Sequence, residues 1–129
     1  LTGVTGPHTA LSVSITAPTK GYLVVDGSSD VHSFAAASFA QCFITLDDHY
    51  ALGSYRTIGL DASAGNSEED CTTGVTIPVA AGKHKIQLRA VIPHITTTFD
   101  KTTLSAQFVP FNGQGKRPTT QEITAALEQ

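Results

Sequence analysis

The chain has 129 residues, of which 40% are hydrophobic and only 15% are charged, and its net charge is −3 at neutral pH. This length suits a single domain with one core, and the composition argues against disorder or a coiled coil. The eight Lys and Arg residues are scattered, so neither nucleic acid nor an anionic membrane is an expected partner. No apolar run approaches the roughly 20 residues that a helix needs to span a bilayer.

The first half of the chain contains segments whose alternation predicts β-strands with one buried face. Residues 9–17 alternate cleanly and end at a Pro/Gly corner. Residues 22–27 form a short apolar strand that ends in Asp-Gly, which is a strong turn signal. Residues 31–39 fit either a weak strand or a loop, residues 40–47 predict a clear strand, and residues 50–61 hold two short strand candidates.

The second half contains a predicted hairpin and a last strand. Residues 62–70 are acidic and loop-like. Residues 72–92 predict a β-hairpin whose corner lies at 80–83, because strict alternation follows a glycine-containing turn. Pro78 indicates an edge position or the end of a strand, because proline cannot donate a ladder hydrogen bond. After a Thr-rich connection, residues 102–111 predict the last strand.

The C-terminal tail has a different pattern. Within residues 116–129, a threonine followed three residues later by a glutamate forms a capping-box signature, and Ile123 and Leu127 lie four positions apart. We therefore expect a short helix in this tail, which needs a surface to dock on. The remaining residues, 1–115, are expected to form one β-domain with an extended N-terminal arm.

Roughly eight short strands and no core helix predict an all-β fold, with a jelly-roll β-sandwich as the favoured variant. Three segments, SITAPTKGYLVVDGSSDV, VAAGKHKIQL and LSAQFVPFNG, occur in an order that resembles bacterial domains of the C1q/TNF-like jelly-roll type. The resemblance covers about residues 9–112, and His84 resembles a structural turn histidine of the family pattern. It implies a compact jelly roll, usually extracellular and often trimeric, that works through binding or assembly.

The chain has two cysteines, Cys42 and Cys71, with no CxxC motif or Cys/His cluster around them. The simplest interpretation is one disulfide, which indicates an oxidising compartment and thus a secreted or cell-surface protein. Two buried free thiols are the alternative.

Asp47, Asp48 and His49 form the densest cluster of potential metal ligands. They could contribute to a cation site, with Ca²⁺ as the cofactor considered, although calcium needs about six to eight oxygen ligands. A polar β-turn is the alternative for these three residues. The acidic run at 68–70 is interpreted as a solvated loop, with calcium binding again as the alternative.

The sequence contains no recognised catalytic signature. It lacks a G-x-S-x-G elbow, a P-loop and a dinucleotide fingerprint, so we do not expect an enzyme. The absence of tryptophan weakens a glycan-binding interpretation, because sugar sites favour flat aromatic platforms. Tyr22, Tyr50 and Tyr55 remain as platform candidates, although packing in the core or its rim is their simpler role.

These observations predict a non-catalytic extracellular recognition or assembly domain that acts through protein–protein contacts as a homotrimer. Interface candidates come from the last strands and the tail: Phe99, Phe108, Phe111, Ile123 and Leu127. One alternative is a filament or surface-layer subunit whose N-terminal arm adds a strand to its neighbour. A second alternative is a glycan-binding module.

Overall fold

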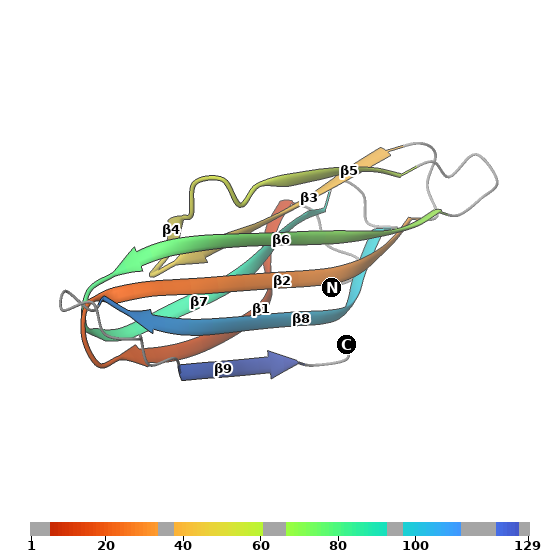
Figure 1. The fold of residues 1–129 in the computed structure, drawn as a ribbon. Coiled ribbons are helices and arrows are strands. Elements are labelled where there is room, and N and C mark those ends of the chain that lie inside the picture. Colours follow the sequence, from red (N-terminus) through yellow and green to blue (C-terminus); the bar gives the residue numbers. More distant parts are fainter. Residues whose placement is uncertain (1–5, 34–37, 61–66, 93–96, 112–120, 127–129) are drawn as a thin grey trace.

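The computed structural model describes residues 6–33, 38–60, 67–92, 97–111 and 121–126. They form two antiparallel sheets that lie face to face, which confirms the predicted all-β sandwich (Figure 1). Sheet A contains, in order, β1 (Gly6–Ala17), β7 (Gly82–Ile92) and β3 (Ser38–Leu46), and β3 pairs in turn with β4 (His49–Tyr50) and β5 (Arg56–Leu60). Sheet B contains, in order, β6 (Ser67–Val79), β2 (Gly21–Ser33), β8 (Thr97–Pro110) and β9 (Gln121–Ala126).

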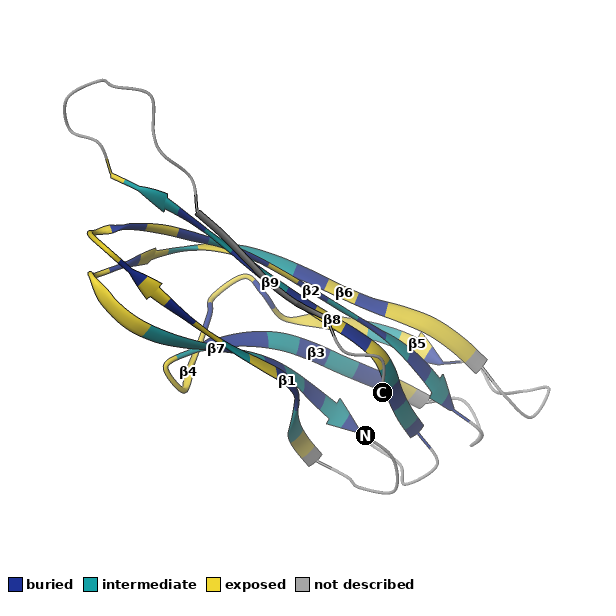
Figure 2. Cartoon of the chain, turned by 90° about the horizontal axis from the view of Figure 1, so that it is seen from below, coloured by how far each residue is buried: buried dark blue, intermediate teal, exposed yellow. Residues whose placement is uncertain are grey.

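The core lies between the two sheets, and buried residues alternate with more exposed ones along the strands (Figure 2). On β7 every second residue from Ile86 to Ile92 is fully buried, and the intervening residues are partly exposed. The predicted alternation of residues 102–111 is confirmed in β8. That of residues 9–17 and 40–47 is confirmed in β1 and β3, except that Val13 and Leu46 are only partly buried and that Ala10 and Thr45 are also buried. The largest fully buried side chains include Leu23, Val25, Ile44, Ile86, Leu88, Phe99, Leu104 and Phe108.

A disulfide between Cys42 and Cys71 links the two sheets, as the cysteine count predicts. Cys42 lies on β3 of sheet A and Cys71 on β6 of sheet B, and both are fully buried. The bridge joins residues 29 positions apart. It therefore closes one side of the sandwich covalently.

The predicted hairpin over residues 72–92 is wrong in its pairing. Both strands exist, but β6 pairs with β2 in sheet B, whereas β7 pairs with β1 and β3 in sheet A. The corner at residues 80–83 therefore crosses from one sheet to the other, and Gly82 permits this with a φ of 127°. Pro78 does lie on an edge strand, because β6 is the outer strand of sheet B.

The turn predicted at Asp26-Gly27 is also absent, because β2 continues through both residues to Ser33. Gly27 is needed for packing. A Cβ at this position would lie 3.0 Å from the Leu88 Cδ1 atom of the opposite sheet. Gly74 has a similar role beside Asp26, whose Oδ1 atom would lie 2.6 Å from an added Cβ.

Three segments form strands where the sequence predicted a loop, a connection or a helix. Residues 67–70 belong to β6, although they were expected in a loop, and residues 97–101 belong to β8. In the tail, the predicted helix is not found over Gln121–Ala126, which form β9 and pair antiparallel with β8. The helix expected within the tail is too short to be stable without a docking surface, whereas a strand here gains ladder hydrogen bonds from the edge of β8.

Candidate functional site

Three aromatic side chains cluster on the outer face of sheet A. Phe43 points outward from β3 because its neighbours, Cys42 and Ile44, point into the core. Tyr50 on β4 pairs with Thr45 and so faces the same side, and Tyr55 precedes β5. The Phe43 ring centroid lies 5.8 Å from that of Tyr50 and 5.3 Å from that of Tyr55. We call Phe43, Tyr50 and Tyr55 the aromatic surface.

The loop between the two tyrosines is fixed by a buried serine. Ser54 Oγ donates to the Ala51 carbonyl at 2.7 Å and accepts from the Ile44 N–H at 2.9 Å. The Ser54 carbonyl also accepts a hydrogen bond from the Thr73 hydroxyl, which lies on sheet B. The Tyr55 hydroxyl donates to Gln41 Oε1 at 2.6 Å. The aromatic surface is thus held in place before any partner binds.

Polar side chains from neighbouring strands border the aromatic surface. A hollow of about 390 Å³ lies here, lined by Pro7, Phe43, Thr45, Asp48, Tyr50, Gln87 and Arg89. Arg89 Nη1 donates to the Thr9 hydroxyl at 2.6 Å. Asp48 Oδ1 lies 2.7 Å from Lys85 Nζ. The hollow therefore combines flat apolar rings with positioned donors and acceptors, as small-molecule sites do.

The predicted metal ligands Asp47, Asp48 and His49 lie at the β3–β4 turn, where both aspartates have positive φ angles, as in a type I′ hairpin turn. Asp47 Oδ2 lies 2.7 Å from His84 Nδ1, and its Oδ1 accepts the Lys85 N–H at 2.8 Å. Asp48 pairs with the Lys85 side chain. The described residues contain no group of three or more His, Cys, Asp or Glu side chains placed to hold a metal ion.

His84 ties this turn to the corner between β6 and β7. Its Nδ1 faces the Asp47 carboxylate and its Nε2 lies 2.7 Å from the Ala80 carbonyl oxygen. Two acceptors suit the doubly protonated ring, and the hydrogen bonds to Asp47 and to Ala80 raise the pKa of His84 above its ordinary 6.5. Partial burial raises the pKa of Asp47, but the hydrogen bonds from His84 and Lys85 outweigh this effect, so the pKa of Asp47 lies below its ordinary value of 3.8.

This pair predicts a pH dependence of stability. Since the folded pKa of His84 is raised, its contribution is complete below about pH 6.5 and is lost as pH rises through the folded pKa. Asp47, whose pKa is lowered, contributes above about pH 3.8 and loses its contribution as pH falls through its folded pKa. Solvent screens the pair because the Asp47 side chain is 44% exposed, so we expect a loss of roughly 0.5–1 kcal/mol on the alkaline side.

The measurement is urea unfolding at pH 5.5 and pH 8.5 for the natural chain and for His84→Gln. The variant should be less stable at pH 5.5 and should converge with the natural chain at pH 8.5. An unchanged difference between the two proteins at both pH values would contradict the assigned protonation.

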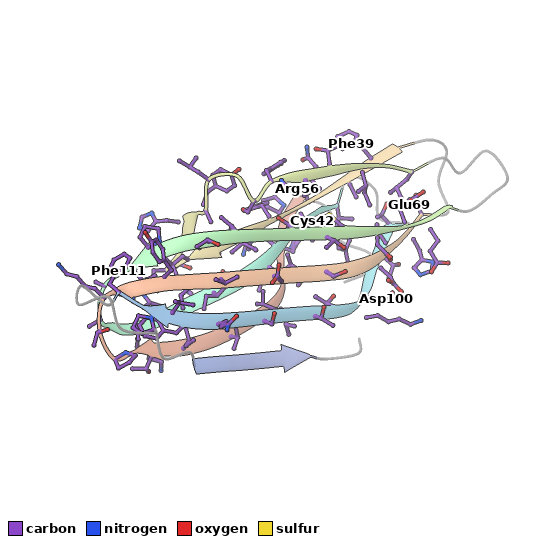
Figure 3. The ribbon with its side chains drawn as sticks, in the orientation of Figure 1. Phe39, Cys42, Arg56, Glu69, Asp100 and Phe111 are labelled. Atoms are coloured by element: carbon purple, nitrogen blue, oxygen red, sulfur yellow. A yellow bond between two sulfur atoms is a disulfide. The ribbon has the colours of Figure 1, made fainter. Side chains whose placement is uncertain are left out.

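An acidic group that sequence analysis did not predict lies at one end of sheet B. Asp30 pairs in register with Asp70 on β6 and Asp100 on β8, and Figure 3 shows Asp100 and Glu69 at this end. The hydrogen bond and the negative charge of Asp30 raise the pKa of Asp70. His32 Nε2 lies 3.8 Å from Asp100 Oδ1. The three aspartates are 30 to 70 positions apart in the sequence, so only strand register could have revealed the group.

The predicted interface residues lie in different environments. Phe99 and Phe108 fill the core, each 1% exposed. Phe111 is half-exposed, and its ring packs edge-on against Tyr22 with centroids 4.5 Å apart. Ile123 belongs to β9, but its side chain lies outside the described residues, as does Leu127. We call Tyr22 and Phe111 the end patch, because Phe111 lies at the opposite end of the sandwich from Asp100 (Figure 3).

The other sequence-based expectations concern partners. The N-terminal arm was expected over the first residues, but Gly6 onward pairs with β7 of the same chain, and residues 1–5 lie outside the described part. The part of the chain that the structure describes includes no helix with the length and apolar character to cross a membrane.

Comparison with known proteins finds no family model and no curated protein that matches the chain.

Proposed function

We propose that the protein is a non-catalytic extracellular recognition domain of the C1q/TNF-like jelly-roll type, which assembles as a homotrimer. The observation that supports recognition most strongly is the aromatic surface on sheet A. Its two tyrosines are exposed, Tyr50 at 43% and Tyr55 at 41%, and the loop between them is hydrogen-bonded in place. Clustered aromatic side chains beside an arginine are typical of surfaces that bind partners.

Two features support the extracellular and jelly-roll parts of the proposal. The buried disulfide fits a compartment in which disulfides form and persist. The chain passes repeatedly between the sheets, from β1 in sheet A to β2 in sheet B and back to β3, and later from β6 to β7 to β8. Such crossings are typical of double-sheet jelly rolls, and they agree with the three segments that resemble the C1q/TNF-like type.

The end patch is the surface that we assign to assembly. Tyr22 is 40% exposed on the outer face of sheet B, and Phe111 is 48% exposed beside it. The Phe111 N–H donates to the Lys20 carbonyl at 3.0 Å, which fixes the backbone under the patch. Because the end patch and the aromatic surface lie on different sheets, assembly at one leaves the other accessible.

Light scattering at micromolar concentration tests the assembly. The natural chain should have about three times the subunit mass of 13.5 kDa, and Phe111→Ala should shift it to the monomer. Tyr50→Ala is the matched control and should keep the trimer mass. EDTA should not change the mass, since Asp47 and Asp48 already have protein partners. A natural chain that remains monomeric would contradict the proposed trimer.

A further inference from the structure

The hollow beside the aromatic surface has the chemistry of a sugar site. We infer that it binds glycans, with one hexopyranose unit seated against Phe43 and Tyr50 and the rest of the glycan extending into solvent. This inference rests on the proposed recognition function and names its ligand. The supporting observations are the arrangement of the rings, the polar groups around them and the size of the hollow.

The two rings that line the hollow form a corner. The planes of Phe43 and Tyr50 meet at 74°, whereas Phe43 and Tyr55 stack at 15°. Tyr50 also meets Tyr55 at 78°, with ring centroids 6.0 Å apart, so it packs edge-to-face against the stacked pair, and of the three rings only Phe43 and Tyr50 line the hollow. A pyranose ring has an apolar face of C–H groups, and it can pack on one aromatic ring while its edge meets another.

The polar groups of the hollow suit sugar hydroxyls, which both donate and accept hydrogen bonds. Gln87 and Arg89 lie two positions apart on β7 and therefore face the same side as the rings. The Gln87 amide oxygen accepts from the Thr45 hydroxyl at 3.4 Å, which directs the amide NH₂ group elsewhere as a donor. Arg89 is oriented by its bond to Thr9, and Asp48 supplies carboxylate acceptors.

Size and charge favour a glycan over a protein partner at this position. The volume of about 390 Å³ lies in the range of roughly 300–1,000 Å³ that small-molecule sites occupy. The centre of a protein interface is usually depleted of aspartate, glutamate and lysine, although arginine is common there. Here Asp48 and Arg89 both line the hollow. Lys85 and Thr9 already hold these two groups in position, and the hydroxyls of a sugar can add hydrogen bonds to both, which a hydrophobic protein patch cannot do.

The experiment uses an array of neutral and uronate-containing hexose oligosaccharides, followed by calorimetry with the oligosaccharide that binds best. The natural chain should bind at least one oligosaccharide. Tyr50→Ala should weaken binding by about tenfold or more because it removes one wall of the corner. Tyr50→Phe should stay within about threefold, since the ring is kept. Phe39→Ala, which removes another half-exposed aromatic side chain of sheet A that does not line the hollow, should leave affinity unchanged.

The inference would be overturned if no oligosaccharide binds the natural chain, or if Phe39→Ala weakens binding as much as Tyr50→Ala does. Amide chemical shifts of the labelled natural chain provide a check that needs no variant. Shifts on addition of the oligosaccharide should concentrate at Phe43, Tyr50 and Gln87, and shifts confined to sheet B would also overturn it. A trimer that binds no glycan defeats only this inference, whereas a glycan-binding monomer defeats only the proposed assembly.

Discussion

Replacing Cys42 and Cys71 together with alanine is expected to lower the free energy of unfolding by about 3–4 kcal/mol. The bridge closes a loop between residues 29 positions apart, so its loss releases the unfolded chain from a substantial constraint. It also removes the covalent link between β3 and β6. Domains of this size are usually stable by only about 5–15 kcal/mol, so the variant should lose a large fraction of its stability.

Urea unfolding followed by circular dichroism measures this effect. Because both sulfur atoms are fully buried, a reductant should act on the natural chain only once urea begins to unfold it. With reductant present, the natural chain should approach the stability of the double variant. The double variant is its own control, since reductant should not change its unfolding. A double variant within about 1 kcal/mol of the natural chain would contradict the role assigned to the bridge.

Phe108→Ala is expected to cost about 3–5 kcal/mol, the range for a buried phenylalanine replaced by alanine. Phe108 is 1% exposed, and its ring lies over Gly21, where an added Cβ would come within 2.6 Å of the ring. The glycine thus leaves space that the ring fills. Removing the ring leaves a cavity that the rigid β2–β8 pair cannot close.

Phe39→Ala is the matched control for Phe108→Ala. Phe39 also lies on a strand, but its side chain is half-exposed, so its loss should cost about 1 kcal/mol or less. Equilibrium unfolding of both variants gives the comparison. If Phe108→Ala left stability unchanged but dissociated the protein, Phe108 would act at an interface, as the sequence-based prediction held, and the core assignment would be wrong.

Alternation predicts which residues of a strand are buried, but it contains no information on strand partners. Residues 82–92 were correctly predicted as a strand with one buried face, and the error lay in pairing them with β6, which is adjacent in sequence but belongs to the other sheet. Gly27 shows a second limit. The sequence does not distinguish a glycine whose backbone freedom permits a turn from a glycine that leaves space for a side chain of the opposite sheet, here Leu88.

The candidate site was partly predictable. Tyr50 and Tyr55 were identified as platform candidates. The strict alternation that follows the corner at 80–83 places Gln87 and Arg89 on the solvent-facing side of their strand. Their proximity could not be predicted, because it depends on the pairing of β3 with β7, whose paired residues are 40 to 50 positions apart, as Thr45 and Gln87 illustrate. The interface prediction selected phenylalanines by hydrophobicity alone. Hydrophobicity does not distinguish a buried ring, such as that of Phe108, from an exposed one, such as that of Phe111.

In the proposed function the two exposed aromatic groups have different roles: the end patch assembles the protein, and the aromatic surface recognises a ligand. Hydroxyl-radical footprinting of the natural chain, at a concentration where it is assembled and again after dilution to monomers, tests this claim most directly. Assembly should protect Tyr22 and Phe111 while Tyr50 and Tyr55 stay reactive. Protection of Tyr50 and Tyr55, with Tyr22 and Phe111 still reactive, would contradict the account.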